Sequence, residues 1–283
     1  MASVITDTQW TFVRTALERT GDRFSAMVSS APALDVKATK DWSIAETAAH
    51  VTAITWLYTY VIRSDRDPFP FPDLNDHMKS ATLDTVAEFN VITLRHFTER
   101  DTRVLAERLR AEIGQLLRMT ENLDPARQIA WLGDSRIPLA GLFAHLLNEL
   151  QIHGHDISRA IGTRWEIPPR EAAQFFELFF MGVAHNDVGR LLDTGVPPLD
   201  RRIAIAFHSP YTTDATLVLR KGRISAEEPG GDVDVRVSFD PATLNLMLFH
   251  RISRLRALLS GKVVVTGRRP WLLLPFLRLV NMP

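Results

Sequence analysis

The sequence predicts an α+β protein, in which a four-helix bundle precedes a smaller α+β unit. In the first 165 residues apolar side chains recur at spacings of three, four and seven, which is typical of amphipathic helices. After residue 198 short segments rich in Val, Ile and Thr alternate with turn residues such as Lys221-Gly222, which indicates strands. We therefore expect three parts: a helical bundle over 1–165, a connecting helix and linker over 166–198, and an α+β unit over 199–283.

The first two helices are indicated by an apolar stripe and by a capping pattern. The stripe predicts a helix around Gln9–Met27. Ser43 followed by Glu46 matches a capping box, in which the serine accepts a first-turn amide and the glutamate reaches back to the cap. A second helix should therefore begin near Ile44.

Two further helical regions complete the predicted bundle. One spans about 80–121, with an interruption near 99–101, and follows a proline-rich loop over 67–72. The other spans about 138–162, where Gly162 and the prolines soon after it indicate the end of the helix.

The second half of the chain is expected to begin with a helix over 169–188, whose phenylalanine cluster we interpret as core that joins the two parts. A small, largely antiparallel sheet should follow. Its expected strands are 201–207, 215–219, 223–226, 232–239 and 262–266, with helical stretches at 241–260 and 271–280.

The charge composition argues against a nucleic-acid-binding protein. The 283 residues are 46% hydrophobic, and Lys plus Arg and Asp plus Glu both number 33, so the chain lacks the positive charge of a nucleic-acid-binding protein. From Pro241 to the end there is no acid, while Lys and Arg supply seven positive charges. This excess favours either an anionic partner or an ordinary solvated face that is balanced by acids elsewhere.

The absence of cysteine and of familiar motifs narrows the chemistry further. Without cysteine the chain has no disulfide, thiolate ligand or cysteine nucleophile, so thiol chemistry would need a thiol from outside. No dinucleotide, nucleotide-phosphate or serine-hydrolase motif is present. Met1–Trp10 does not resemble a signal peptide, and no apolar run approaches the ~18 residues of a membrane span, so we expect a cytoplasmic protein.

Three residues are candidate metal ligands. Glu149 and His153 are four residues apart, so a helix places them on one face, and His50 on another helix could supply a third ligand. His145 competes with His50, but three ligands along one straight helix would span about 12 Å, too far for one ion. Bundle cores are regular places for such sites. The alternative interpretation is a chance spacing, with His50 a hydrogen-bonded core histidine.

Two stretches carry a resemblance to a known family. Trp42 to His50, and the run Glu149-Leu-Gln-Ile-His153-Gly-His-Asp156-Ile-Ser-Arg-Ala-Ile-Gly162, resemble the mycothiol-dependent maleylpyruvate isomerase family. The resemblance implies a DinB-like helical bundle with a sterol carrier protein-like domain after it. It also implies that His50, Glu149 and His153 bind a divalent metal, usually zinc, and that a low-molecular-weight thiol, mycothiol in actinobacteria, is the cosubstrate.

The resemblance extends to one residue of the second part. Arg251 lies where family members often have a Gly-Arg pair whose arginine reaches the active site, although here His250 replaces the glycine. Such an arginine could hold a substrate carboxylate by paired hydrogen bonds. Asp156 could orient the His153 imidazole, or it could pair with Arg159 on the helix surface.

The function expected on these grounds is that of a thiol-dependent isomerase or S-transferase. A free thiol has a pKa of about 8.5 and is mostly protonated at neutral pH, whereas a metal-bound thiol is deprotonated and can attack a small electrophile, an anionic one included. Two alternatives remain: a metal-dependent hydrolase with the same three ligands, and a non-enzymatic carrier of an apolar ligand. The sequence carries no signal for one particular substrate or for an oligomeric state.

Overall fold

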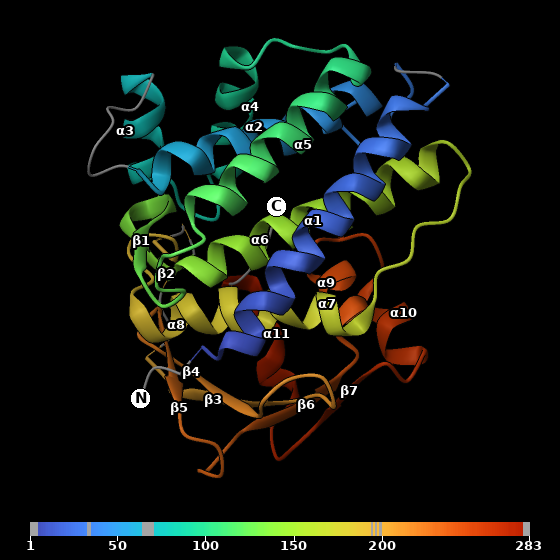
Figure 1. Cartoon of the computed structure of the whole chain (residues 1–283). Coiled ribbons are helices and arrows are strands. Elements are labelled where there is room, and N and C mark those ends of the chain that lie inside the picture. The colour runs from blue at the N-terminus through green and yellow to red at the C-terminus, as the bar shows by residue number, and fades with distance from the viewer. Residues whose placement is uncertain are drawn as a thin grey trace.

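The helices and the sheet form two layers that lie one above the other (Figure 1). The structure is a computed structural model, and it describes residues 5–32, 35–63, 71–193, 195, 197 and 200–279. The α+β class with a helical N-terminal bundle is confirmed. The helices of the bundle are α1 (Asp7–Ser29), α2 (Ile44–Val61), α3 (Pro72–Ser80), α4 (Val86–His96), α5 (Thr102–Met119) and α6 (Leu139–Ala160).

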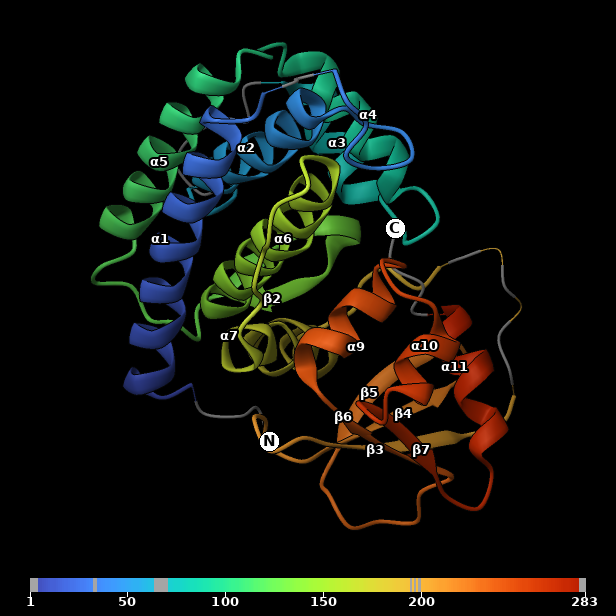
Figure 2. The same ribbon diagram turned by 90° about the vertical axis from the view of Figure 1, so that its right-hand side faces the viewer.

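Helix α6 is the centre of the bundle. It contacts α1 and α2, which in turn pack against α5 on the outer side (Figure 2). Its residues are buried nearly all round, from Leu139 to Ser158. A helix that is apolar on most faces belongs in the interior, and polar side chains on it are therefore held away from water. Gly162 follows its last turn with φ at 71°, as the predicted stop signal requires.

The capping pattern before α2 forms as predicted. The Ser43 hydroxyl accepts from the Glu46 amide at 3.2 Å, and the Glu46 carboxylate accepts from the Ser43 amide at 2.7 Å. The cap thus fixes the start of the helix, which places His50 in the second turn. This local signal sets the position of one side chain of the candidate site.

The expected helix over 80–121 is wrong in its first part. Ser80 ends α3, a helix that sequence reasoning missed, and the chain is not helical again until Val86. Proline is favoured at the first helical position, where its missing N–H is not needed, so Pro72 begins α3 and does not close the predicted loop. Residues 67–70 of that loop lie outside the described residues. The predicted interruption is confirmed, because Asp101 caps α5.

A short hairpin that sequence reasoning also missed leads into α6. It consists of β1 (Gln128–Ala130) and β2 (Arg136–Pro138), paired antiparallel. Strands of three residues are too short to show an alternating pattern. The turn between them includes Gly133 at φ 65°, where a Cβ would lie 2.5 Å from the Ala81 carbonyl oxygen.

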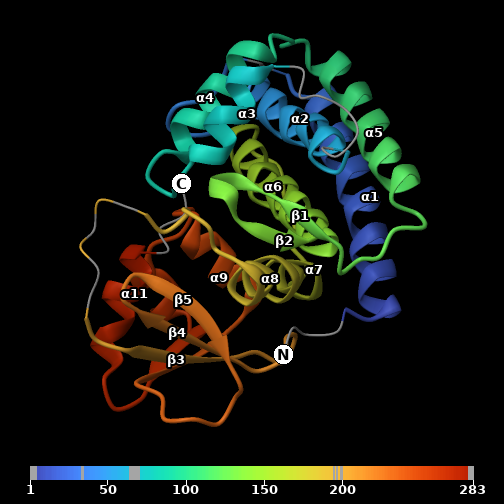
Figure 3. The same cartoon turned by 90° about the vertical axis from the view of Figure 1, so that its left-hand side faces the viewer.

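One long helix lies between α6 and the sheet (Figure 3). It is α7 (Pro169–Gln174), a π-helical turn (Phe175–Phe180) and α8 (Met181–Asn186) in sequence, as predicted for 169–188. Phe175 and Phe179 belong to the core of the bundle, while Phe176 belongs to the core of the sheet. The predicted joining role of this cluster is confirmed.

The sheet has five strands in the order β5-β4-β3-β6-β7, with β3 and β6 parallel and the other pairs antiparallel. Alternate residues of β3, such as Ile205 and Phe207, pack against the helices on one face. The elements are β3 (Ile203–His208), β4 (Ala215–Arg220), β5 (Arg223–Glu227), β6 (Val235–Phe239), α9 (Pro241–Leu248), α10 (Arg254–Leu259), β7 (Val263–Thr266) and α11 (Leu273–Leu279).

The expected helix over 241–260 is divided into α9 and α10. His250 lies in the break with φ at 61°, a left-handed conformation that a right-handed α-helix does not accommodate. The last predicted helix is shorter than expected, because Pro270–Leu272 forms a 3₁₀ turn before α11, and Val280 lies outside the described residues. Within the described ranges no helix is both long and apolar enough to cross a membrane.

Candidate metal centre

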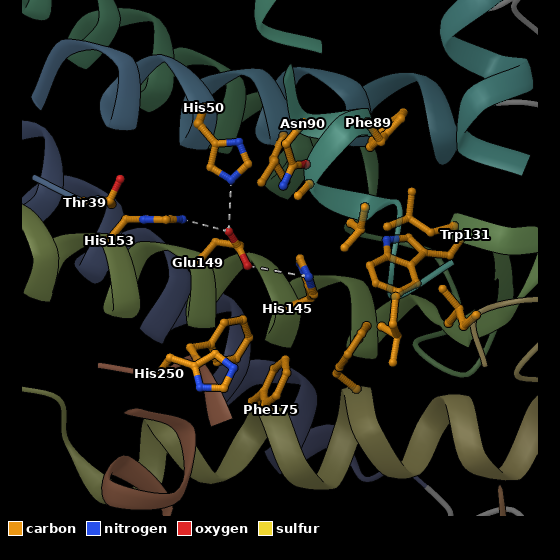
Figure 4. Close-up of a pocket in the computed structure, with 18 of the residues that line it drawn as sticks. Thr39, His50, Phe89, Asn90, Trp131, His145, Glu149, His153, Phe175 and His250 are labelled. Carbon is orange, nitrogen blue, oxygen red and sulfur yellow. Dashed lines mark ion pairs between the residues drawn. The ribbon is translucent and has the colours of Figure 1, made fainter. Parts of the chain in front are cut away.

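Helices α2 and α6 bring His50, Glu149 and His153 together, as the sequence predicted (Figure 4). One potential ligand atom from each lies within 4.8 Å of the others. The Nε2 atoms of His50 and His153 each lie 3.4 Å from Oε2 of Glu149. The four-residue spacing on α6 aligns the carboxylate with one imidazole, and the crossing of α2 supplies the other.

The three side chains are shielded from water. His50 is 3% exposed, and Glu149 and His153 are each 7% exposed. The Trp42 ring lies over them, with its centroid 4.5 Å from that of His50 and 6.2 Å from that of His153. The Trp42 amide donates to the Thr39 hydroxyl at 2.9 Å, which anchors this cover at the start of α2. Such shielding strengthens the electrostatic interactions of the centre.

Asp156 orients His153. Oδ2 of Asp156 lies 3.2 Å from Nδ1 of His153, so the Nδ1–H group donates to the carboxylate, and the lone pair of Nε2 points towards Glu149. Burial acts to raise the pKa of Asp156, but hydrogen bonds from His153 and Arg251 hold it well below its ordinary value. Asp156 is therefore an anion that fixes the imidazole.

Arg251 from the sheet-containing part completes this arrangement. Its Nη2 atom lies 2.6 Å from Oδ2 of Asp156 and its Nε atom lies 3.0 Å from Oδ1, while Nη1 donates to the Phe249 carbonyl oxygen at 2.6 Å. The alternative partner of Asp156, Arg159, is exposed on α6 and lines the cavity. Arg251 thus acts on the centre through Asp156.

The charge of Glu149 is held by the imidazoles around it. Burial acts to raise the pKa of Glu149, but the imidazoles of His153 and His50 beside it hold it well below its ordinary value. Burial lowers the pKa of His50. The pKa of His153 is raised because, against burial, Asp156 and Glu149 favour its charged form. The centre is therefore a buried carboxylate between two nitrogen bases of different strength.

His145, the competing ligand in the sequence, contacts the other oxygen of Glu149. Its Nε2 atom lies 3.7 Å from Oε1, and its Nδ1 atom lies 2.8 Å from the Tyr58 hydroxyl. The Trp131 indole N–H, which can only donate, lies 3.4 Å from that hydroxyl. The Tyr58 proton therefore goes to Nδ1, and the Nε2–H group of His145 faces Glu149.

Sequence reasoning missed the hydrogen bonds that run from Trp131 through Tyr58 to His145. Tyr58 is on α2, Trp131 follows β1, and His145 is on α6, so no spacing in the sequence connects them. The i to i+4 spacing of His145 and Glu149 was the one available signal. In the structure it marks a residue that supports the carboxylate from the side opposite His50.

Gly154 permits a close approach next to His153. A Cβ at this position would lie 2.3–2.7 Å from three atoms of the Trp165 indole. Trp165 comes from the segment after α6 and packs edge-on against Phe24, with Arg23 over its ring. The absence of a side chain at Gly154 therefore makes room for the Trp165 indole.

A cavity of about 980 Å³ opens from the centre. His50, Glu149, His153 and Asp156 line one end of it. From there it extends between α4 on one side and the π-helical turn and α8 on the other (Figure 4). A small molecule can thus reach the exposed side of the three candidate ligands.

Comparisons with known proteins give one family and two solved structures of low similarity. The family model described as DinB superfamily matches residues 5–157. No curated protein matches the sequence. The crystal structure of a mutant of the mycothiol-dependent maleylpyruvate isomerase has a TM-score of 0.49 at 14% identity, covering 93% of both chains. A second crystal structure of that isomerase has a TM-score of 0.45 at 15% identity, covering 89% of this chain and 91% of the other.

Proposed function

Because this chain belongs to the DinB superfamily, we propose that it is a metal-dependent enzyme that activates a low-molecular-weight thiol for attack on an electrophile. His50, Glu149 and His153 are the proposed ligands of the metal, with zinc as the first candidate. Mycothiol is the proposed thiol, from the resemblance at residues 42–50 and 149–162. The observation that carries the proposal is the convergence of these three buried side chains at one end of a large cavity.

The donor set fits a divalent cation. The Nδ1–H of His153 is committed to Asp156, so its Nε2 lone pair faces a carboxylate oxygen at 3.4 Å. Two acceptors at such a distance need a cation between them, either a proton or a metal ion. Two imidazoles and one carboxylate, with a fourth position open, match the ligands of a catalytic zinc. The carboxylate–histidine contact of Asp156 is also typical of ligand histidines.

A bound metal ion would supply the positive charge that converts a thiol into a nucleophilic thiolate. A divalent metal at these ligands would stabilise a thiolate at neutral pH, where a free thiol of pKa about 8.5 is mostly protonated. Glu149 lowers the net charge of the centre, and His50 and His153 hold its geometry. Trp42 packs against His50 and His153 and lines the same end of the cavity.

The choice of a thiol over water as the nucleophile rests on the resemblance at residues 42–50 and 149–162, because coordination to a metal lowers the pKa of either one. Asp156 is committed to His153 and Arg251, and the Nδ1 lone pair of His145 is committed to Tyr58. These two residues are therefore not free to act as a general base towards a bound water.

The test is product analysis with and without thiol. Metal-loaded protein is incubated with an α,β-unsaturated carbonyl compound and mycothiol, and the products are separated by mass. A thioether adduct identifies an S-transferase, and a rearranged substrate of unchanged mass identifies an isomerase. Product that forms equally well without thiol would contradict this proposal. The Glu149→Ala protein is the control for uncatalysed addition.

A further inference from the structure

The cavity is large for a small polar substrate. Its volume of about 980 Å³ lies at the upper end of the range for drug-sized ligands, roughly 300–1,000 Å³. Such a volume accommodates a thiol at the candidate metal centre together with a second, elongated molecule. What that second molecule is can be inferred from the side chains along the cavity.

The lining changes in character away from the centre. The charged side chains come from residues 37–41, from α6 and from Arg251, all at the end where His50 and His153 lie. Among the described residues, those contributed by α4, the π-helical turn, α8 and the segment 188–192 are apolar except for Asn90. We call this region the apolar arm, defined by Val86, Phe89, Phe179, Val183, Leu191 and Leu192. Trp131 lies at this end, away from His153 (Figure 4).

The cation expected to bind a substrate carboxylate is already in use. All three guanidinium nitrogens of Arg251 are engaged, two by Asp156 and one by the Phe249 carbonyl oxygen. The other Lys and Arg side chains of the lining, Lys37, Lys40 and Arg159, are exposed, and none of them belongs to the apolar arm. A carboxylate placed in the apolar arm would lose its hydration without gaining a cation, which is strongly unfavourable.

We propose that the electrophile is an uncharged, elongated and largely apolar molecule, an α,β-unsaturated carbonyl compound with an alkyl or aryl tail. The tail lies in the apolar arm, and the Asn90 amide is the group from α4 that can donate to the carbonyl oxygen. This inference rests on the proposed function, because that function puts the attacking sulfur at His50, Glu149 and His153. It replaces the small anionic electrophile that Arg251 led us to expect.

The reaction balances without a further reagent. The thiol loses its proton to solvent, and its sulfur forms a bond to the β-carbon of the substrate. The carbon–carbon π bond breaks, and its electron pair moves to the α-carbon and carbonyl oxygen. A proton from water then adds at the α-carbon, so that thiol and unsaturated carbonyl give one thioether.

Binding tests the inference without metal or thiol. The neutral fluorophore N-phenyl-1-naphthylamine is titrated into full-length protein after chelation, and 1-hexanol, 1-octanol and 1-decanol are used to displace it. Each methylene that enters the apolar arm should strengthen displacement by about fourfold. Octanoate should compete far less well than 1-octanol at neutral pH. Equal competition by octanoate and 1-octanol, or no dependence on chain length, would overturn the inference.

A pair of variants locates the binding. Ala184 is partly buried on α8 and lines the cavity, whereas Ala111 is exposed on α5 and does not. Ala184→Trp should weaken fluorophore binding by about tenfold or more, since loss of burial for as few as about two methylenes has that effect and the indole is larger than that. Ala111→Trp should leave it unchanged. Equal binding by wild type and a folded Ala184→Trp protein would also overturn the inference.

Turnover separates this inference from the proposed function. With metal and mycothiol, kcat/KM for 2-alkenals should rise with chain length, mainly through a lower KM. Turnover with no preference for longer chains would contradict the apolar substrate but keep thiol activation. Chain-length-dependent binding of alcohols with no thiol-dependent turnover would remove the proposed function, and with it the reactive role of the ligand in the apolar arm.

Discussion

Arg251 and Asp156 form an ion pair that connects the sheet-containing part to the central helix of the bundle. They are 95 residues apart in sequence, and the guanidinium binds both carboxylate oxygens. Asp156 in turn holds the Nδ1 atom of His153. The position of a proposed metal ligand therefore depends on how the two parts of the chain pack together. This relationship gives Arg251 an effect on the centre without contact with the metal.

The first prediction concerns this ion pair. Asp156→Ala leaves Arg251 partly buried without its partner, and breaking a buried pair in this way costs about 3–5 kcal/mol of unfolding free energy. The same change frees the His153 ring, so metal affinity should fall by about 10–100-fold. Urea unfolding and metal titration measure the two effects.

A surface pair provides the control for Asp156→Ala. Arg268 and Asp232 also form an ion pair, but both side chains are largely exposed. Asp232→Ala should leave the unfolding free energy and the metal affinity close to those of wild type, because solvent screens exposed pairs. If Asp156→Ala had no more effect than Asp232→Ala, Arg251 and Asp156 would have no role at the centre.

The second prediction concerns the donor chain behind Glu149. Tyr58→Phe removes the hydroxyl that joins Trp131 to His145, and the loss of a buried hydrogen-bond partner should cost about 1–3 kcal/mol. His145 would then hold the Glu149 carboxylate less firmly, so metal affinity should fall by about tenfold. Tyr211→Phe, at an exposed position, is the control for removal of a hydroxyl. Unchanged metal affinity in Tyr58→Phe would remove this positioning role.

The third prediction concerns Gly154. In an ordinary helix interior glycine to alanine stabilises by about 1 kcal/mol. Here the new methyl group would lie 2.3 Å from the Trp165 ring, so Gly154→Ala should destabilise the protein by about 1–3 kcal/mol instead. Gly231→Ala, where no atom lies within 4 Å of the added carbon, should have little effect. A higher unfolding free energy for Gly154→Ala than for wild type would contradict the close approach of Trp165.

The fourth prediction concerns His250, which has φ at 61°. Histidine tolerates this conformation better than most residues, and glycine adopts it freely. His250→Gly should therefore change the midpoint of thermal unfolding little, while His250→Val should destabilise by about 1–3 kcal/mol. Equal stability of the two variants would show that backbone conformation is not what selects the residue before Arg251.

What the sequence predicted well depends on neighbours along the chain. The Ser43 and Glu46 cap set the start of α2 and so the position of His50. The spacing of Glu149 and His153 placed both on one face of α6, and the family resemblance connected them to His50. The long amphipathic pattern of α6 and its glycine stop gave the bounds of the helix closely. Each of these signals depends on residues that are close to one another in the sequence.

What the sequence could not predict depends on contacts over long separations. Trp131 is 73 residues from Tyr58, and Tyr58 is 87 residues from His145, so no local pattern indicates their hydrogen bonds. The alternatives for Asp156 were an imidazole or Arg159 on the same helix. The partner from the other part of the chain, Arg251, was expected to bind substrate. The apolar arm likewise combines side chains from α4 and α8, far apart in sequence.

The measurement that tests the central claim most directly is metal content by elemental analysis. Purified wild type is compared with His50→Ala, Glu149→Ala and His153→Ala, each with its fold verified by circular dichroism. We expect about one zinc per wild-type chain and its loss in all three variants, with retention in His208→Ala, whose side chain is exposed. Wild type without metal, and without stoichiometric uptake on reconstitution, would contradict the account.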